Sequence, residues 1–166
     1  MAGPSGTRRG WKFDRANGRL AAVYNDTEVF DFDANDMGVS VDIVSSGGIL
    51  STSATDGIGY TTGAGGSVTQ ITSAATGVTI NKVCGAITTV ALTTAAAAEE
   101  RFTVTNSTVG SSDVIALSTS YDGAGTPILG VQKMAFNAFD IVITNVHAAN
   151  ALNDVMVINF VVIQGG

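Results

Sequence analysis

Short runs of strand-forming residues fill the sequence from Ser67 to Gln164. Val, Ile, Thr and Ala alternate within each run, and Gly, Asn, Ser and Asp separate the runs. Alternation with a period of two places one side of a strand in a core and the other outside. There are about eight runs, at the spacing typical of an all-β sandwich or barrel. The pattern therefore predicts an all-β fold, specifically an antiparallel jelly-roll or Greek-key β-sandwich.

We expect the strands of this domain within residues 68–72, 78–81, 85–92, 101–106, 113–118, 128–133, 135–145 and 155–163. Residues 95–100 are the only window compatible with a helix. They lack apolar periodicity, so we interpret them as a loop with at most one helical turn. Because strands do not alternate with helices, a parallel α/β sheet is disfavoured.

The N-terminal region predicts a small β-meander, beginning with an N-terminal β-hairpin arm. Residues 11–13 form a short strand, Asn17-Gly18 provides a turn, and residues 20–24 form the return strand of the hairpin. Residues 28–33 alternate strictly, and residues 39–44 form a further strand. An aromatic face is expected from Trp11, Phe13, Phe30 and Phe32. Such a small sheet is marginally stable alone, so this face should pack on something.

Glycine, serine and threonine dominate the stretch between these two regions. A loop of this length is unusual inside a compact domain. We therefore predict three parts: an arm and small meander over residues 1–52, a linker over 53–66, and a β-sandwich domain over 67–166.

The charge pattern limits the partners. The net charge is −6 and only 13% of residues are charged, about half the share of a typical globular domain. An acidic chain lacks the cationic surface that nucleic acid requires, so no nucleic-acid partner is expected. A surface of Thr, Ser, Asn and Gly favours a homo-oligomer over a neutral-faced monomer.

Five basic residues lie near the N-terminus, ahead of an acidic segment over residues 26–42. They are Arg8, Arg9, Lys12, Arg15 and Arg19. Such an arm can dock on an acidic surface, or it can be a solvated leader with no specific role. Both interpretations remain open. The acidic segment lacks the loop pattern of an EF-hand, so a solvated strand face is the simpler interpretation, but calcium binding also remains open.

The sequence contains no complete catalytic or metal-binding set. Cys84 is the only cysteine and His147 the only histidine. One of each is too few for a zinc site, and no Gly-x-Ser-x-Gly motif accompanies the histidine. We expect Cys84 to be a small buried apolar residue and His147 to make a loop or interface hydrogen bond. The prediction is a protein with no enzymatic activity, no catalytic residues, no cofactor and no metal.

Neither a secretory signal nor a membrane-spanning segment is expected. The Arg8-Arg9 pair is followed by Trp11-Lys12-Phe13-Asp14 rather than an apolar stretch. No window approaches the ~18 apolar residues of a membrane-spanning helix. No membrane partner is therefore predicted.

Three groups of residues resemble a widespread family of tailed-bacteriophage virion proteins, and the likeness covers roughly residues 57–166. The first is Gly63-Ala64-Gly65-Gly66-Ser67-Val68-Thr69-Gln70, and the second is Gly77-Val78-Thr79-Ile80-Asn81-Lys82. The third is the ending Asn159-Phe160-Val161-Val162-Ile163. The resemblance implies a β-sandwich on the outside of a virion, in a family with no catalytic residues to transfer.

The resemblance leads to two hypotheses. The resembling family includes decoration (cement) and head-fibre types, and the first hypothesis is a capsid decoration (cement) protein, made in the host cytoplasm and located on the capsid surface. Its partners would be the major capsid protein and itself, as a trimer. Its capsid-binding residues would be Arg8, Arg9, Trp11, Lys12, Phe13, Arg15, Arg19, Phe30 and Phe32. The second is a tail fibre or adsorption-associated protein that binds host surface glycan, with Tyr60 and Tyr121 as candidate stacking residues.

Overall fold

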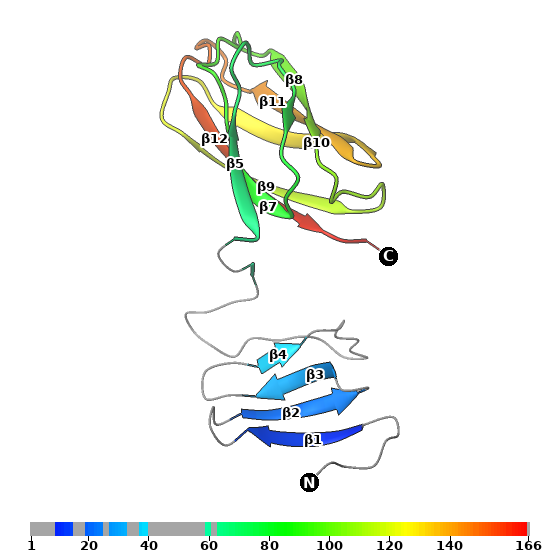
Figure 1. The fold of residues 1–166 in the computed structure, drawn as a ribbon. Helices are drawn as coiled ribbons and strands as arrows, with labels where there is room; N and C mark the ends of the chain where they lie inside the picture. Colours follow the sequence, from blue (N-terminus) through cyan, green and yellow to red (C-terminus); the bar gives the residue numbers. More distant parts are fainter. Residues whose placement is uncertain are drawn as a thin grey trace. The chain divides into compact units, whose positions relative to one another are not determined.

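The computed structural model describes residues 9–14, 19–24, 27–32, 37–39, 59–60 and 63–165. The chain divides into two compact units, Met1–Ile58 and Gly59–Gly166. Every regular element in the described residues is a β-strand (Figure 1). The division between the units falls inside residues 53–66, the stretch predicted to be a linker, whose role stays a prediction.

The first unit contains a four-stranded antiparallel meander. Its strands are β1 (Arg9–Asp14), β2 (Arg19–Tyr24), β3 (Thr27–Phe32) and β4 (Met37–Val39), and they pair in sequence order. The first three lie where the alternating pattern predicted them. β4 covers only the start of the expected 39–44 strand, and the rest of that stretch lies outside the described residues.

The register of this meander aligns the aromatic positions. Trp11 is opposite Ala22, which is opposite Phe30 on the next strand. A second row places Phe13 and Phe32 on either side of Leu20. Directly opposite residues of an antiparallel pair lie on the same face of the sheet. The four aromatic positions therefore belong to one face.

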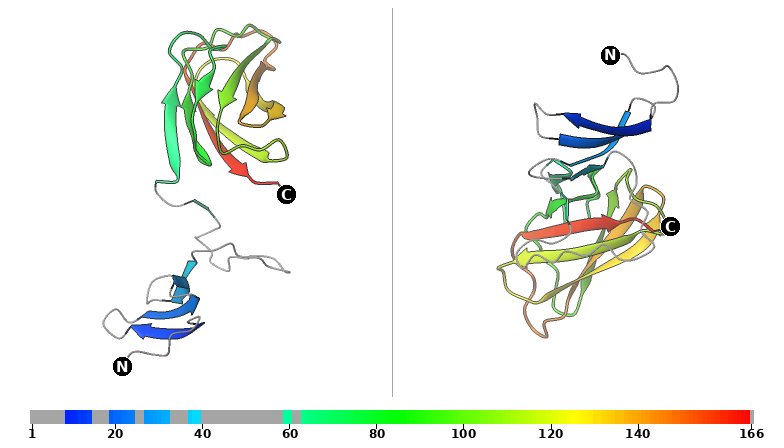
Figure 2. Two further views of the ribbon diagram at one scale, coloured as in Figure 1. Left: turned by 45° about the vertical axis from the view of Figure 1, so that its right-hand side comes forward. Right: turned by 90° about the horizontal axis from the view of Figure 1, so that it is seen from below.

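The second unit is a sandwich of two four-stranded sheets (Figures 1 and 2). Its strand order is β5-β7-β12-β9 in one sheet and β10-β11-β8-β6 in the other. The bounds are β5 (Gly65–Thr69), β6 (Val78–Thr79), β7 (Cys84–Thr88), β8 (Glu99–Thr105), β9 (Val114–Tyr121), β10 (Pro127–Ala135), β11 (Ala138–Asn145) and β12 (Met156–Ile163). The predicted all-β fold and its eight strands are confirmed.

Both sheets are mixed rather than antiparallel. β5 pairs with β7 in parallel, and β6 pairs with β8 in parallel. The expectation of a purely antiparallel sandwich is wrong for these two pairs. The reason is that the chain changes sheet at each step from β5 to β8. Strands that neighbour each other in a sheet are then two apart in sequence and run in the same direction.

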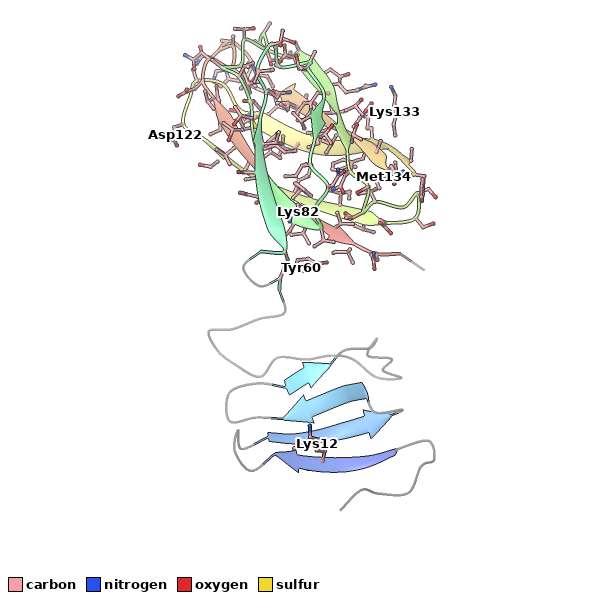
Figure 3. All side chains as sticks on the ribbon, viewed as in Figure 1. Lys12, Tyr60, Lys82, Asp122, Lys133 and Met134 are labelled. Carbon is pink, nitrogen blue, oxygen red and sulfur yellow. The ribbon has the colours of Figure 1, made fainter. Side chains whose placement is uncertain are left out.

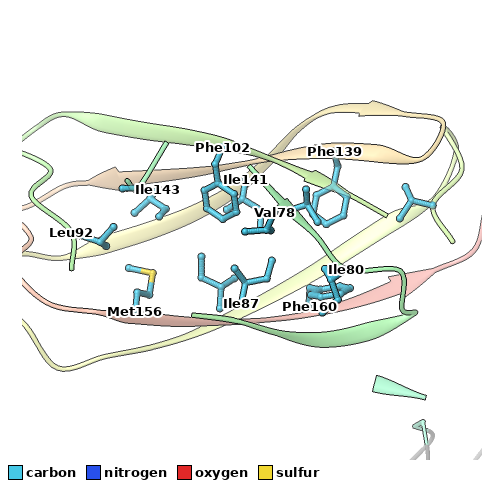
Figure 4. Close-up of a cluster of buried hydrophobic side chains, with 14 of the residues drawn as sticks. Val78, Ile80, Ile87, Leu92, Phe102, Phe139, Ile141, Ile143, Met156 and Phe160 are labelled. Atoms are coloured by element: carbon cyan, nitrogen blue, oxygen red, sulfur yellow. The ribbon is translucent and has the colours of Figure 1, made fainter. Parts of the chain in front are cut away.

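The core lies between the two sheets (Figure 4). β12 shows the alternation most clearly, because every second side chain from Met156 to Val162 is buried. The rings of Phe139 on β11 and Phe160 on β12 meet across the core, with centroids 6.3 Å apart. Burying one such apolar side chain contributes about 1.5–3 kcal/mol. The sandwich therefore has a hydrophobic core of its own.

Candidate functional site

The predicted capsid-binding residues fall on the first three strands where the structure describes them. Arg9, Trp11, Lys12 and Phe13 lie on β1, Arg19 lies on β2, and Phe30 and Phe32 lie on β3. Lys12 is exposed (Figure 3). Arg8 and Arg15 lie outside the described residues. Register brings the aromatic positions together, while the role of the set in binding stays a prediction.

The described side chains that point outward from the strands β5, β7, β12 and β9 include no carboxylate, ammonium, guanidinium or imidazole group. Register forms rows across this outer face, such as Ser67, Ala86, Asn159 and Ser118. We call this surface the uncharged face. Its members are Gly65, Ser67, Thr69, Cys84, Ala86, Thr88, Val114, Ala116, Ser118, Ser120, Val157, Asn159, Val161 and Ile163.

Exposed aliphatic side chains lie at one end of the uncharged face. Val114 is 59% exposed and its neighbour Ile163 is 55% exposed. Val161 lies on the next row and is also exposed. Cys84, opposite Val161, is half-buried on this outer face. The expectation that Cys84 is buried was therefore wrong, because the inward positions of β7 are Gly85 and Ile87.

The outer face of the other sheet is charged. Asp140 on β11 is buried, and its carboxylate accepts a hydrogen bond from the Thr103 hydroxyl at 2.7 Å. The Lys133 ammonium lies 3.3 Å from the same carboxylate (Figure 3). Lys133 sits at an irregularity of β10 and has a φ of 48°. The Thr103 hydrogen bond, with help from Lys133, lowers the pKa of Asp140.

A buried asparagine connects the loops at one end of the sandwich. The Asn145 amide nitrogen donates to the carbonyls of Thr94 at 3.2 Å, Ala95 at 3.1 Å and Asn150 at 2.8 Å. Its amide oxygen accepts from the backbone N–H groups of Thr126 and His147, each at 3.1 Å. All of the side chain's main hydrogen-bonding groups are thus used. No local sequence pattern indicates this role, because most of the partners are backbone groups far apart in the chain.

His147 makes a loop hydrogen bond, as predicted. Its Nδ1 accepts from the backbone N–H groups of Ala149 at 3.1 Å and Asn150 at 2.9 Å. Within the described residues, no three His, Cys, Asp or Glu side chains cluster as metal ligands would. Most of the acidic segment over residues 26–42 lies outside those residues, so calcium binding there stays open.

The candidate aromatic residues for glycan binding differ in their surroundings. Tyr121 is half-buried, and its hydroxyl donates to the Ala124 carbonyl and accepts from the Asn153 N–H. Tyr60 is 50% exposed, with its hydroxyl bonded to the Val162 carbonyl (Figure 3). Phe136 is 78% exposed. We expected it within a strand, but it lies in the two-residue turn between β10 and β11.

Comparisons with known proteins returned no relative. No family model, no curated protein and no solved structure matches the chain. No helix in the described part of the chain is long and apolar enough to cross a membrane.

Proposed function

We propose that this chain is a bacteriophage capsid decoration (cement) protein that binds the outside of the head and stabilises the shell. The observation that carries the proposal is a sandwich of two sheets, one of which has a broad and uncharged outer face. Such a face suits contact with other proteins better than chemistry on a small molecule. We also propose that residues 57–166 belong to the virion surface proteins they resemble. The proposal includes a jelly-roll or Greek-key course of the strands.

The mechanism is mechanical rather than chemical. DNA packed densely inside a head pushes the shell outward, so a protein that spans joints between capsid subunits adds contacts that expansion must break. Residues 1–52 anchor the chain through the aromatic positions of β1 and β3 and through the neighbouring basic residues. The sandwich forms a trimer, and several linked contacts raise the overall affinity beyond that of one contact.

One observation favours a second function, a tail fibre or adsorption protein that binds host glycan. Phe136 presents an exposed ring on a hairpin turn, and sugars commonly stack on exposed aromatic rings. Tyr121 is less suited to this role, because its hydroxyl already makes two hydrogen bonds within the protein.

Antibody labelling of purified virions tests the proposal and separates it from the alternative. A decoration protein gives label over the whole head surface. A tail fibre gives label confined to the tail. Absence of the chain from purified virions contradicts both functions, whereas label on the tail alone overturns the first.

A further inference from the structure

We propose that the uncharged face of the sheet β5-β7-β12-β9 is covered by a second copy of this chain. The proposal deepens the self-association included in the proposed function by assigning it to a specific surface. It also stands independently of the head, because it concerns only contacts between copies.

Charge is the first argument for a second copy as the occupant. The chain carries a net charge of −6, so most pairs of surfaces on two copies bring like charges together. The uncharged face carries no side chain that is charged at neutral pH in its ordinary state, so two copies can meet there without repulsion and without burying an unpaired charge. A charged partner would find no complementary group on this face.

The two outer faces of the sandwich differ in charge, and this difference also favours a second copy on the uncharged face. The sheet β10-β11-β8-β6 carries Glu99, Arg101, Lys133 and Asp140. Glu99 and Lys133 are exposed, and the buried Asp140 is paired with Lys133. On the uncharged face, Val114, Val161 and Ile163 expose aliphatic surface, and the polar side chains that register places on the same face are those of Ser, Thr and Asn residues. The carboxylate of Asp113 lies just beyond the end of this face, where it accepts from the Gly165 N–H. Depletion of charge with retained apolar area is the composition of an interface core.

The shape of the face also fits packing of sheet against sheet. Its side chains are mostly small, so the faces of two copies can approach to the usual sheet separation of about 10 Å. From strand spacing and rise per residue, the face measures about 19 Å by about 24 Å, or about 450 Å² per copy. Two copies then bury about 900 Å², less than the about 1,200 Å² of stable specific interfaces and in the range of weak, transient ones. The contact should therefore be reversible on dilution.

A charge placed at the centre of the face tests the assignment. Asn159 is exposed on the inner strand β12, between the small residues Ala86 and Ser118. Asn159→Lys adds an ammonium there without reaching the core. The matched control is Thr105→Lys, because Thr105 is exposed on β8, an inner strand of the other sheet. Circular dichroism of both variants verifies that they fold.

Sedimentation of the full chain between about 1 μM and about 100 μM, a range suited to a small interface, measures the association. We expect the natural chain and Thr105→Lys to associate as concentration rises, and Asn159→Lys to weaken association at least tenfold. Because a face that packs on the same face of another copy closes the contact after two chains, the uncharged face gives dimers, and the trimer of the proposed function requires a further contact. A dimer that Asn159→Lys dissociates supports the proposal. A natural chain that stays monomeric, or an Asn159→Lys variant that associates normally, overturns the proposal. These results leave the labelling test on virions unaffected.

Cys84 offers a second measurement without any substitution. It is the only cysteine of the chain and lies on the uncharged face beside Val161. A second copy should shield its thiol, so we expect its rate constant for modification by a small thiol reagent to fall as protein concentration rises. A rate constant independent of concentration overturns the proposal even if an Asn159 variant were to misfold.

Discussion

The Asn145→Asp substitution tests whether buried hydrogen bonds fix the loops at one end of the sandwich. The two side chains have nearly the same shape, so the change leaves no cavity. It replaces an N–H₂ donor by an oxygen facing the carbonyls of Thr94, Ala95 and Asn150, at 3.2, 3.1 and 2.8 Å. The hydrogen bonds that the backbone N–H groups of Thr126 and His147 donate to the remaining side-chain oxygen can persist. The perturbation therefore isolates the donor half of the network.

The amide has two N–H donors. Losing both leaves buried carbonyls unsatisfied at about 1–3 kcal/mol each, which predicts a loss of about 3 kcal/mol in the free energy of unfolding. For a domain of this size, that corresponds to a decrease in melting temperature of about 15 °C. Burial beside carbonyl oxygens should raise the pKa of the introduced carboxyl. The penalty is then full above that raised pKa and shrinks as pH falls, because the protonated acid can donate to one carbonyl.

Far-UV circular dichroism during urea unfolding is the assay, since the single tryptophan, Trp11, belongs to the first unit and not to the sandwich. Asn153→Asp is the control, because Asn153 is exposed and only its oxygen accepts, from the Ala124 N–H at 2.7 Å. We expect a change within about 0.5 kcal/mol for that variant. Equal losses in the two variants, or a loss at Asn145 that does not diminish at low pH, would refute the reasoning.

Two further predictions concern backbone packing and charge. In Gly85→Ala, the added Cβ would lie 2.6 Å from the Gly66 carbonyl oxygen, so we expect a loss of about 2–3 kcal/mol by urea unfolding. Gly130→Ala, with nothing within 4 Å of the new Cβ, should stay within about 0.5 kcal/mol, and similar losses would contradict this packing argument. The lowered pKa of Asp140 means that its carboxylate stabilises the fold above its ordinary pKa, and that this stabilisation disappears as pH falls through the lowered value. Asp140→Asn should therefore flatten the decline in melting temperature with acidification, whereas parallel curves for the two proteins would exclude this role.

The sequence pattern predicted the strands well because their side chains alternate strongly. β12 was expected at 155–163 and occupies Met156–Ile163. Boundaries failed where glycine weakened the pattern. β5 begins at Gly65 rather than Val68, because glycines can pair in a strand without adding an apolar side chain. Phe136 was assigned to a strand because nothing in the sequence signals the turn at Asn137, whose φ is 64°.

The surfaces were harder to predict than the strands. The alternation of side chains along each strand identifies the outward residues. The rows across the uncharged face, however, depend on which strands are neighbours in the sheet. The parallel pairing of β5 with β7 places Ser67 opposite Ala86, and no local sequence pattern predicts that pairing. The same holds for Asp140, whose partners Thr103 and Lys133 come from two other strands. Long-range register decided both features.

Binding of the purified chain to phage heads that lack it tests the central claim most directly. Co-sedimentation should show saturable binding of the intact chain, and heads that carry it should withstand higher temperature before releasing DNA. A chain lacking residues 1–52 should retain the sandwich, which has its own core, but should no longer sediment with heads. Failure of the intact chain to bind or stabilise heads would contradict the account, and undiminished binding by the shortened chain would contradict the anchoring role of the arm.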